Sequence, residues 1–84
     1  MSKIYLEVQV PGNAKTYEFA ADSRMTVGKV KRAFITQVSL TEGREIFADP
    51  AGVLFCSSQL EGLLQDHEKL GDVGVVSGDS IILL

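Results

Sequence analysis

Alternating apolar and polar side chains open the chain and limit what it can fold into. Four apolar residues fall on one side of an extended backbone: Ile4, Leu6, Val8 and Val10. Three others fall on the opposite side: Tyr5, Glu7 and Gln9. A period of two over residues 3–10 predicts a strand with one buried and one solvated face. Because turn residues 11–13 separate it from a second alternation that starts at Thr16, we expect an antiparallel hairpin.

After the hairpin, the spacing of apolar residues changes to that of a helix. Four of them recur three or four positions apart: Val27, Val30, Phe34 and Val38. Thr26 suits the N-cap position, because its hydroxyl can accept a hydrogen bond from a backbone N–H of the first turn. We therefore predict a helix from residue 27 to about residue 38, with Lys29, Arg32 and Thr36 on its solvated face.

The second half of the chain contains shorter segments. Residues 44–48 and 53–56 predict two short strands, joined by a turn at residues 49–52. Residues 58–61 match the capping-box pattern that starts many helices, and three leucines follow with helical spacing: Leu60, Leu63 and Leu64. We therefore predict a short second helix that ends near Lys69. The apolar run at 80–84 predicts a last, buried strand.

This order of elements predicts an α+β fold in a single domain, residues 1–84. We expect a mixed four- to five-stranded sheet, with one long helix packed across it and a short second helix. If the first and last strands pair in parallel at the centre of the sheet, the connection between them must carry the helix over one face.

Charge and hydropathy restrict the location and the partners. Eight Lys and Arg against eleven Asp and Glu leave a net charge of −3, which argues against nucleic-acid binding, because that binding needs clustered positive charge. The first residues lack the apolar run of a secretory signal, and no stretch approaches the ~20 apolar residues that span a bilayer. A single cysteine excludes an internal disulfide. We expect a cytoplasmic protein without direct membrane insertion.

Side chains that carry catalysis are scarce. Cys56 lies in an apolar strand segment, where cysteine behaves as a small hydrophobe, and His67 lies in a polar segment. We interpret them as a packed thiol and a solvated imidazole rather than a nucleophile and its base. One cysteine and one histidine do not supply a zinc site, and no glycine-rich loop matches a nucleotide-binding pattern. We expect no catalytic residue, no metal and no cofactor.

The surface is therefore the candidate for function, and the sheet face opposite the helix comes first. Alternation places Ile46 and Phe47 on opposite faces, and we expect Phe47 to be the more exposed, beside Tyr5. The densest positive patch is Arg24, Lys29, Lys31 and Arg32, either a solvated helix face or a contact for an acidic partner. The predicted partner-binding residues are Tyr5, Gln9, Glu18, Phe47, Arg24, Lys29 and Arg32. Residues 57–69 either cover the open face or leave it free.

The order and lengths of the elements resemble the β-grasp, or ubiquitin-like, fold. Three segments carry the resemblance: the hairpin, the helix start at residues 25–31, and the ending at residues 70–83 with its Leu-Gly-Asp and Gly-Asp pairs. Chain length and the ending are most similar to the YukD/EsaB group of small bacterial ubiquitin-like proteins. The segment from Ser57 to Lys69 departs from that group. The resemblance implies a cytoplasmic accessory or regulatory component of type VII (ESX-like) secretion that contacts a membrane-embedded component of that machinery. Hydrophobic content and a possible open sheet edge make self-association feasible, and we expect a monomer or weak homodimer.

The last residues of the sequence bear on whether the chain reacts through its carboxyl end, as some proteins of this fold do. Ubiquitin and the sulfur carriers of the fold react through a flexible tail that ends in Gly-Gly, whereas this sequence ends in Ile82-Leu83-Leu84, within the predicted last strand. We expect neither conjugation nor sulfur transfer, and no enzyme activity. The alternative is an enzyme-linked β-grasp protein, either a degenerate sulfur carrier or a small accessory subunit of a multicomponent oxygenase.

Overall fold

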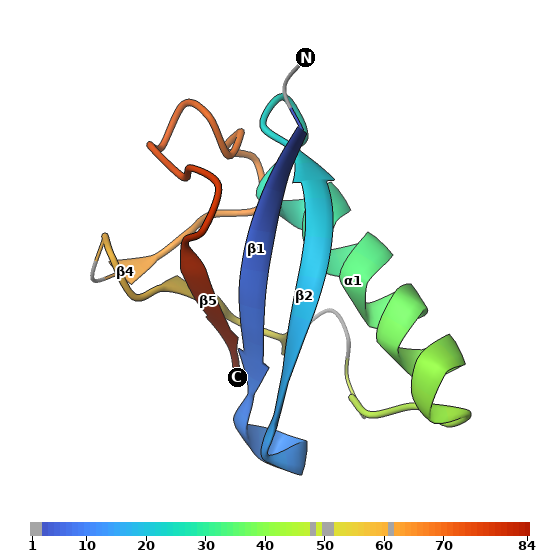
Figure 1. Cartoon of the computed structure of the whole chain (residues 1–84). Helices are drawn as coiled ribbons and strands as arrows, with labels where there is room; N and C mark the ends of the chain where they lie inside the picture. Colours follow the sequence, from blue (N-terminus) through green and yellow to red (C-terminus); the bar gives the residue numbers. More distant parts are fainter. Residues whose placement is uncertain (1–2, 48, 50–51, 61) are drawn as a thin grey trace.

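In the part of the chain that the structure describes, one mixed sheet, one α-helix and one turn of 3₁₀-helix make up the regular structure (Figure 1). The computed structural model describes residues 3–47, 49, 52–60 and 62–84. Its five strands are β1 (Lys3–Val10), β2 (Lys15–Asp22), β3 (Phe55–Ser57), β4 (Gly62–Leu63) and β5 (Ser80–Leu83). They lie side by side in the order β2-β1-β5-β3-β4, and the helix is α1 (Val27–Glu42). The chain therefore has the α+β architecture that the order of elements predicts.

The amino-terminal hairpin confirms the prediction from alternation. β1 and β2 pair antiparallel over their whole length, from Lys3 with Asp22 to Val10 with Lys15. The four alternating apolar residues of β1 are buried, and the residues between them face solvent or are half-buried. One turn of 3₁₀-helix, Pro11–Asn13, reverses the chain, and Ala14 closes it in the left-handed conformation with φ 57°. The buried side of β1 forms one side of the hydrophobic core.

Helix α1 packs against the buried side of β1 with the apolar stripe that its sequence predicts. Val27, Val30, Phe34 and Val38 are buried, and the Thr26 hydroxyl accepts a hydrogen bond from the Lys29 N–H at 3.3 Å. The helix continues past the predicted end at residue 38 and stops at Glu42, where Gly43 adopts the left-handed conformation (φ 71°) that ends many helices.

The last turn of α1 is tied to the hairpin by Glu42. Its carboxylate accepts hydrogen bonds from the Lys15 ammonium at 2.6 Å and from the Tyr17 hydroxyl at 3.0 Å. These bonds hold the pKa of Glu42 below its ordinary value, and the same carboxylate raises the pKa of Lys15. The contact explains why the helix runs one turn further than the apolar pattern indicates.

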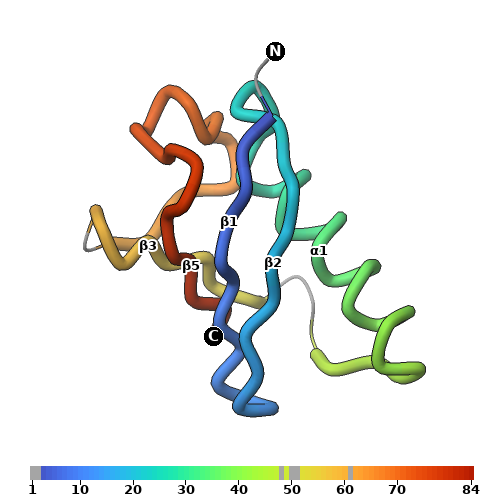
Figure 2. The backbone as a smooth tube through the Cα atoms, viewed as in Figure 1, coloured from blue at the N-terminus to red at the C-terminus, as the bar shows by residue number. Residues whose placement is uncertain are grey.

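The last strand forms as the sequence predicts, and it lies at the centre of the sheet. β5 pairs in parallel with β1, where Val8 faces Ile81, and antiparallel with β3, where Cys56 faces Ile82. Figure 2 shows the last strand, β5, running beside the first strand, β1. Leu54 and Leu84 extend the pairing with β3 by two reciprocal backbone hydrogen bonds of 3.0 and 3.1 Å.

The connection between α1 and β3 differs from the prediction. Residues 44–47 are not a strand, and Ala48 lies outside the described residues. In the predicted turn, the Gly52 N–H donates to the Asp49 carbonyl at 3.0 Å, whereas residues 50 and 51 lie outside the described part. The strand expected at 53–56 begins two residues later. In the described part of the chain, no neighbouring strand pairs with residues 44–47. Their alternating apolar and polar side chains therefore do not form a strand with two distinct faces.

The predicted second helix is wrong. The Ser57 hydroxyl accepts a hydrogen bond from the Leu60 N–H at 3.1 Å, so the chain turns tightly, and β4 then pairs back on β3. Glu61, which completes the capping-box pattern, lies outside the described residues. Turns and extended backbone follow β4 up to Lys69. Antiparallel pairing with β3 supplies hydrogen bonds to backbone groups of the β4 segment, which in a helix would bond within the helix.

Candidate interaction surface

The face of the sheet opposite α1 divides into a polar half and an apolar half. Over β1 and β2 it presents mostly polar side chains: Tyr5, Glu7, Gln9, Thr16, Glu18 and Ala20. Over β5, β3 and β4 it presents mainly apolar ones, because the residues between them point into the core. The two halves meet where Gln9 is paired with Ile82.

The apolar half forms a continuous group, which we name the open-face cluster. Its members are Leu54, Cys56, Leu63, Ile82 and Leu84. Cys56 lies directly opposite both Leu63 and Ile82, so these three side chains share one row across the sheet. Leu54 and Leu84 form the next row on the same face. Leu54, Leu63 and Leu84 are 48%, 53% and 61% exposed, so about half of each leucine faces water.

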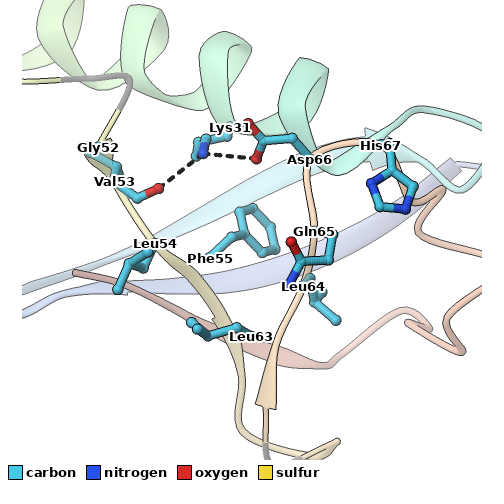
Figure 3. Close-up of a pocket in the computed structure, with 10 residues that line it drawn as sticks. All are labelled: Lys31, Gly52, Val53, Leu54, Phe55, Leu63, Leu64, Gln65, Asp66 and His67. Carbon is cyan, nitrogen blue, oxygen red and sulfur yellow. Dashed lines mark hydrogen bonds and ion pairs between the residues drawn. The ribbon is translucent and has the colours of Figure 1, made fainter.

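A depression continues from this cluster toward the helix (Figure 3). It has a volume of about 450 Å³ and opens where the two arms of the β3–β4 hairpin diverge. Leu54, Phe55 and Leu63 contribute apolar walls, and His67 lies on the opposite arm. The Lys31 ammonium closes the inner end. The depression therefore extends an apolar surface toward one buried positive charge.

Lys31 is the largest departure from the predicted basic patch. Its side chain is buried, and its ammonium donates to the Val53 carbonyl and to the Asp66 carboxylate, both at 2.9 Å. It therefore bridges the two arms of the hairpin. Burying an ammonium is costly unless it is paired and hydrogen-bonded, and these two contacts satisfy that condition.

The other predicted basic residues remain at the surface. Arg32 is exposed on α1, and Arg24 and Lys29 are exposed beside a shallow depression at the start of the helix. Arg24 is paired with Asp22 at 3.0 Å, and its guanidinium lowers the pKa of that carboxyl. The first backbone N–H groups of α1 donate to Glu68, Asp66 and Thr26 oxygens. The donors that would favour an anion at a helix start are therefore used within the chain.

The remaining predicted residues divide between the two sides of the sheet. Tyr5 and Glu18 are exposed and Gln9 is half-buried, all on the polar half of the open face. The Lys3 ammonium lies 5.5 Å from the centre of the Tyr5 ring. Phe47 is instead half-buried against the core between sheet and helix, and Ile46 packs there too. The predicted pairing of Tyr5 with Phe47 is wrong, because residues 44–47 do not enter the sheet.

Sequence reasoning does not find the open-face cluster, because it predicts a packed Cys56, a buried last strand and a helix that includes Leu63. Leu54 with Cys56, and Ile82 with Leu84, lie two residues apart, which places each pair on one face of a strand. That spacing is readable in the sequence. Their exposure is not, because it depends on residues 58–69 leaving this face free. In the described residues, groups of three or more side chains suited to a metal ion are absent.

Comparison with solved structures places this arrangement among ubiquitin-like domains. The N-terminal ubiquitin-like domain of the 4931431F19Rik protein matches at 17% identity over 99% of this chain and 74% of that chain, with a TM-score of 0.72. The ubiquitin-like domain of the Arabidopsis thaliana protein At2g32350 matches at 19% identity over 100% and 78%, with a TM-score of 0.73. A de novo designed protein based on ubiquitin matches at 10% identity over 99% and 88%, with a TM-score of 0.70.

These similarities show a ubiquitin-like β-grasp fold and nothing finer. No family model matches the sequence, and neither does any curated protein. Among the described residues, α1 does not meet the length and hydropathy that crossing a bilayer requires.

Proposed function

We propose that this chain is a non-catalytic protein-interaction module that binds its partner through the open-face cluster. The observation that carries the proposal is a contiguous group of apolar side chains, three of them leucines about half exposed, on a regular sheet face. Exposed apolar patches rimmed by polar residues mark protein contacts. Here the rim is the polar half of the same face. A rigid, hydrogen-bonded sheet also presents the cluster without the entropy cost of ordering a loop.

The proposed setting is the cytoplasmic side of a type VII (ESX-like) bacterial secretion system, with a membrane-embedded component as the partner. Support for it is the similarity of residues 70–84 to the YukD/EsaB group. The proposed role is accessory or regulatory and does not include conjugation. Support for that part is the pairing of Leu84 with Leu54, which holds residues 80–84 in the sheet, so these residues do not supply a flexible reactive tail.

Binding to a detergent-solubilised membrane component of a type VII system tests both parts. The double variant Leu54→Asp with Leu63→Asp places two charges in the cluster, and we expect it to lose at least tenfold in affinity by biolayer interferometry. Leu40→Asp is the matched control, because Leu40 is 77% exposed on α1, outside the cluster. Circular dichroism checks that each variant is folded.

The outcomes separate the setting from the surface. If the wild-type chain does not bind any such component, the secretion setting is wrong. If it binds and the double variant binds equally well, the open-face cluster is not the contact. A loss of affinity in Leu40→Asp equal to that of the double variant would move the contact to α1.

A further inference from the structure

The outer edge of β2 offers backbone hydrogen-bonding groups to a partner. β2 is the end strand of the sheet. The Glu7 N–H donates to the Asp79 carbonyl on the β5 side, so the backbone of Leu6 and Val8 points the other way, toward β2. Their partners in β2, Phe19 and Tyr17, therefore point back to β1. It follows that the N–H and C=O groups of the intervening residues point outward: Thr16, Glu18 and Ala20.

Side chains on the two faces of this edge differ in chemistry. On the open face, Glu18 lies directly opposite Glu7, so two carboxylates occupy neighbouring positions. Like charges in this arrangement are destabilising, and a cation beside them relieves the repulsion. On the helix face, Tyr17 and Phe19 are half-buried and contact Phe34 edge-on at 5.7 and 5.4 Å between ring centres. The edge is thus acidic on one face and aromatic on the other.

We propose that β2 binds an extended segment of a protein partner as a sixth strand, with a lysine or arginine of that segment facing Glu18. The residues on either side of that cation are apolar and pack beside Tyr17 and Phe19. This alternation follows from the period of two along any added strand. The surface is separate from the open-face cluster and goes beyond the proposed function.

Charge also argues against a second copy of the chain as the occupant. Two β2 strands paired antiparallel about Glu18 would place two Glu18 carboxylates opposite each other, next to both Glu7 residues. A basic segment has the complementary charge. Edge charges commonly protect sheets from self-association, and the same charge here selects the partner.

A synthetic peptide tests the proposal directly. The probe is a seven-residue peptide with blocked ends, Ser-Thr-Val-Lys-Val-Thr-Ser, and the control peptide has glutamate in place of lysine. In nitrogen-15 NMR titrations of the full chain at low salt, we expect shifts at the amides of Thr16, Glu18 and Ala20. We expect the lysine peptide to bind about tenfold more tightly than the glutamate peptide.

Two variants examine the charge and the backbone separately. Glu18→Lys should reverse the preference between the two peptides. Ala20→Pro removes one outward N–H without removing a bond to β1, since proline is tolerated on the solvent side of an edge strand, and it should weaken binding at least fivefold. Leu54→Asp should leave peptide binding unchanged, which separates this result from the proposed function.

The proposal is overturned if neither peptide shifts the β2 amides, or if the shifts map to the open-face cluster instead. Equal binding of the lysine and glutamate peptides also overturns it, because the charge would then select nothing. Unchanged binding by a folded Ala20→Pro variant would exclude backbone pairing at this edge.

Discussion

Two regions of this molecule are built in different ways. Residues 3–43 form a regular hairpin and helix in which each element satisfies its own backbone or pairs with its sequence neighbour. Residues 44–79 contain two short strands joined by turns. This second region is bonded both to β5, with which β3 pairs, and to the first region. In the contacts with the first region, the Val27 N–H donates to the Glu68 carbonyl, the Gly28 N–H to the Asp66 carbonyl and the Leu70 N–H to the Met25 carbonyl.

Hydrogen bonds to the start of a helix can therefore fix the position of a region that has little regular structure. Asp66 meets α1 twice, through its carbonyl at Gly28 and through its carboxylate at Lys31. A Cβ atom on residue 28 would lie 3.2 Å from the Asp66 carbonyl oxygen, so glycine permits this close approach. Glycine is less favourable than alanine inside a helix, but at position 28 it allows the second region to dock on α1.

The greatest loss of stability is expected from a variant that tests whether the second region packs into the main hydrophobic core. Leu70 is fully buried, and Leu70→Ala should lower the free energy of unfolding by about 2–5 kcal/mol, because it removes packing and leaves a cavity. Urea denaturation measures the change. Leu63→Ala, at an exposed position of the same region, should change it by about 0.5 kcal/mol or less. Similar small changes in both variants would mean that the second region contributes little to stability.

The next effect concerns the link between the regions. Lys31→Ala leaves the Val53 carbonyl and the Asp66 carboxylate without their common partner, and we expect a loss of about 1–3 kcal/mol. Hydrogen exchange should increase at residues 53–57 and 62–68 and much less in the β1–β2 hairpin. Equal increases in both regions would show that Lys31 does not hold the second region separately.

A smaller effect belongs to the helix start itself. Thr26→Ala removes the hydroxyl that caps the Lys29 N–H, which should lower stability by about 1 kcal/mol. Thr26→Ser keeps the acceptor and serves as the control. Thermal unfolding followed by circular dichroism measures both variants, and equal melting temperatures would contradict the capping role.

The smallest expected effect is pH-dependent and confined to the first region. Because the folded chain lowers the pKa of Glu42, its contribution to stability is present above the ordinary carboxyl pKa and is lost as the pH falls through the lowered value. Glu42→Gln should therefore flatten the decline in stability below about pH 5 and leave the slope near neutral pH unchanged. An unaltered acid slope, measured by urea denaturation, would show that the contact with Lys15 has little weight.

Prediction from the sequence succeeded where the apolar pattern of a segment is regular. The strand at 3–10, the helix start at Thr26 and the last strand all follow patterns that the backbone itself imposes. It failed at residues 58–69, where three leucines with helical spacing instead divide between the exposed positions 60 and 63 and the half-buried position 64. Pairing with β3 overrode the local preference. The error in the candidate site has a separate origin: alternation at residues 44–48 predicts a strand that includes Phe47, and residues 44–47 do not form one.

The two periods in the sequence are enough to predict the hairpin, the helix and the buried face of β1, because side-chain direction in a regular element follows from position alone. The burial of Lys31 and the exposure of Leu54, Leu63 and Leu84 depend instead on tertiary contacts. Those outcomes depend on which distant segment arrives at each surface. The β3–β4 hairpin arrives over Lys31, and no described segment covers the open-face cluster. Contacts between segments distant in the sequence produce no periodic pattern in the sequence, so the burial or exposure of these residues cannot be predicted from it.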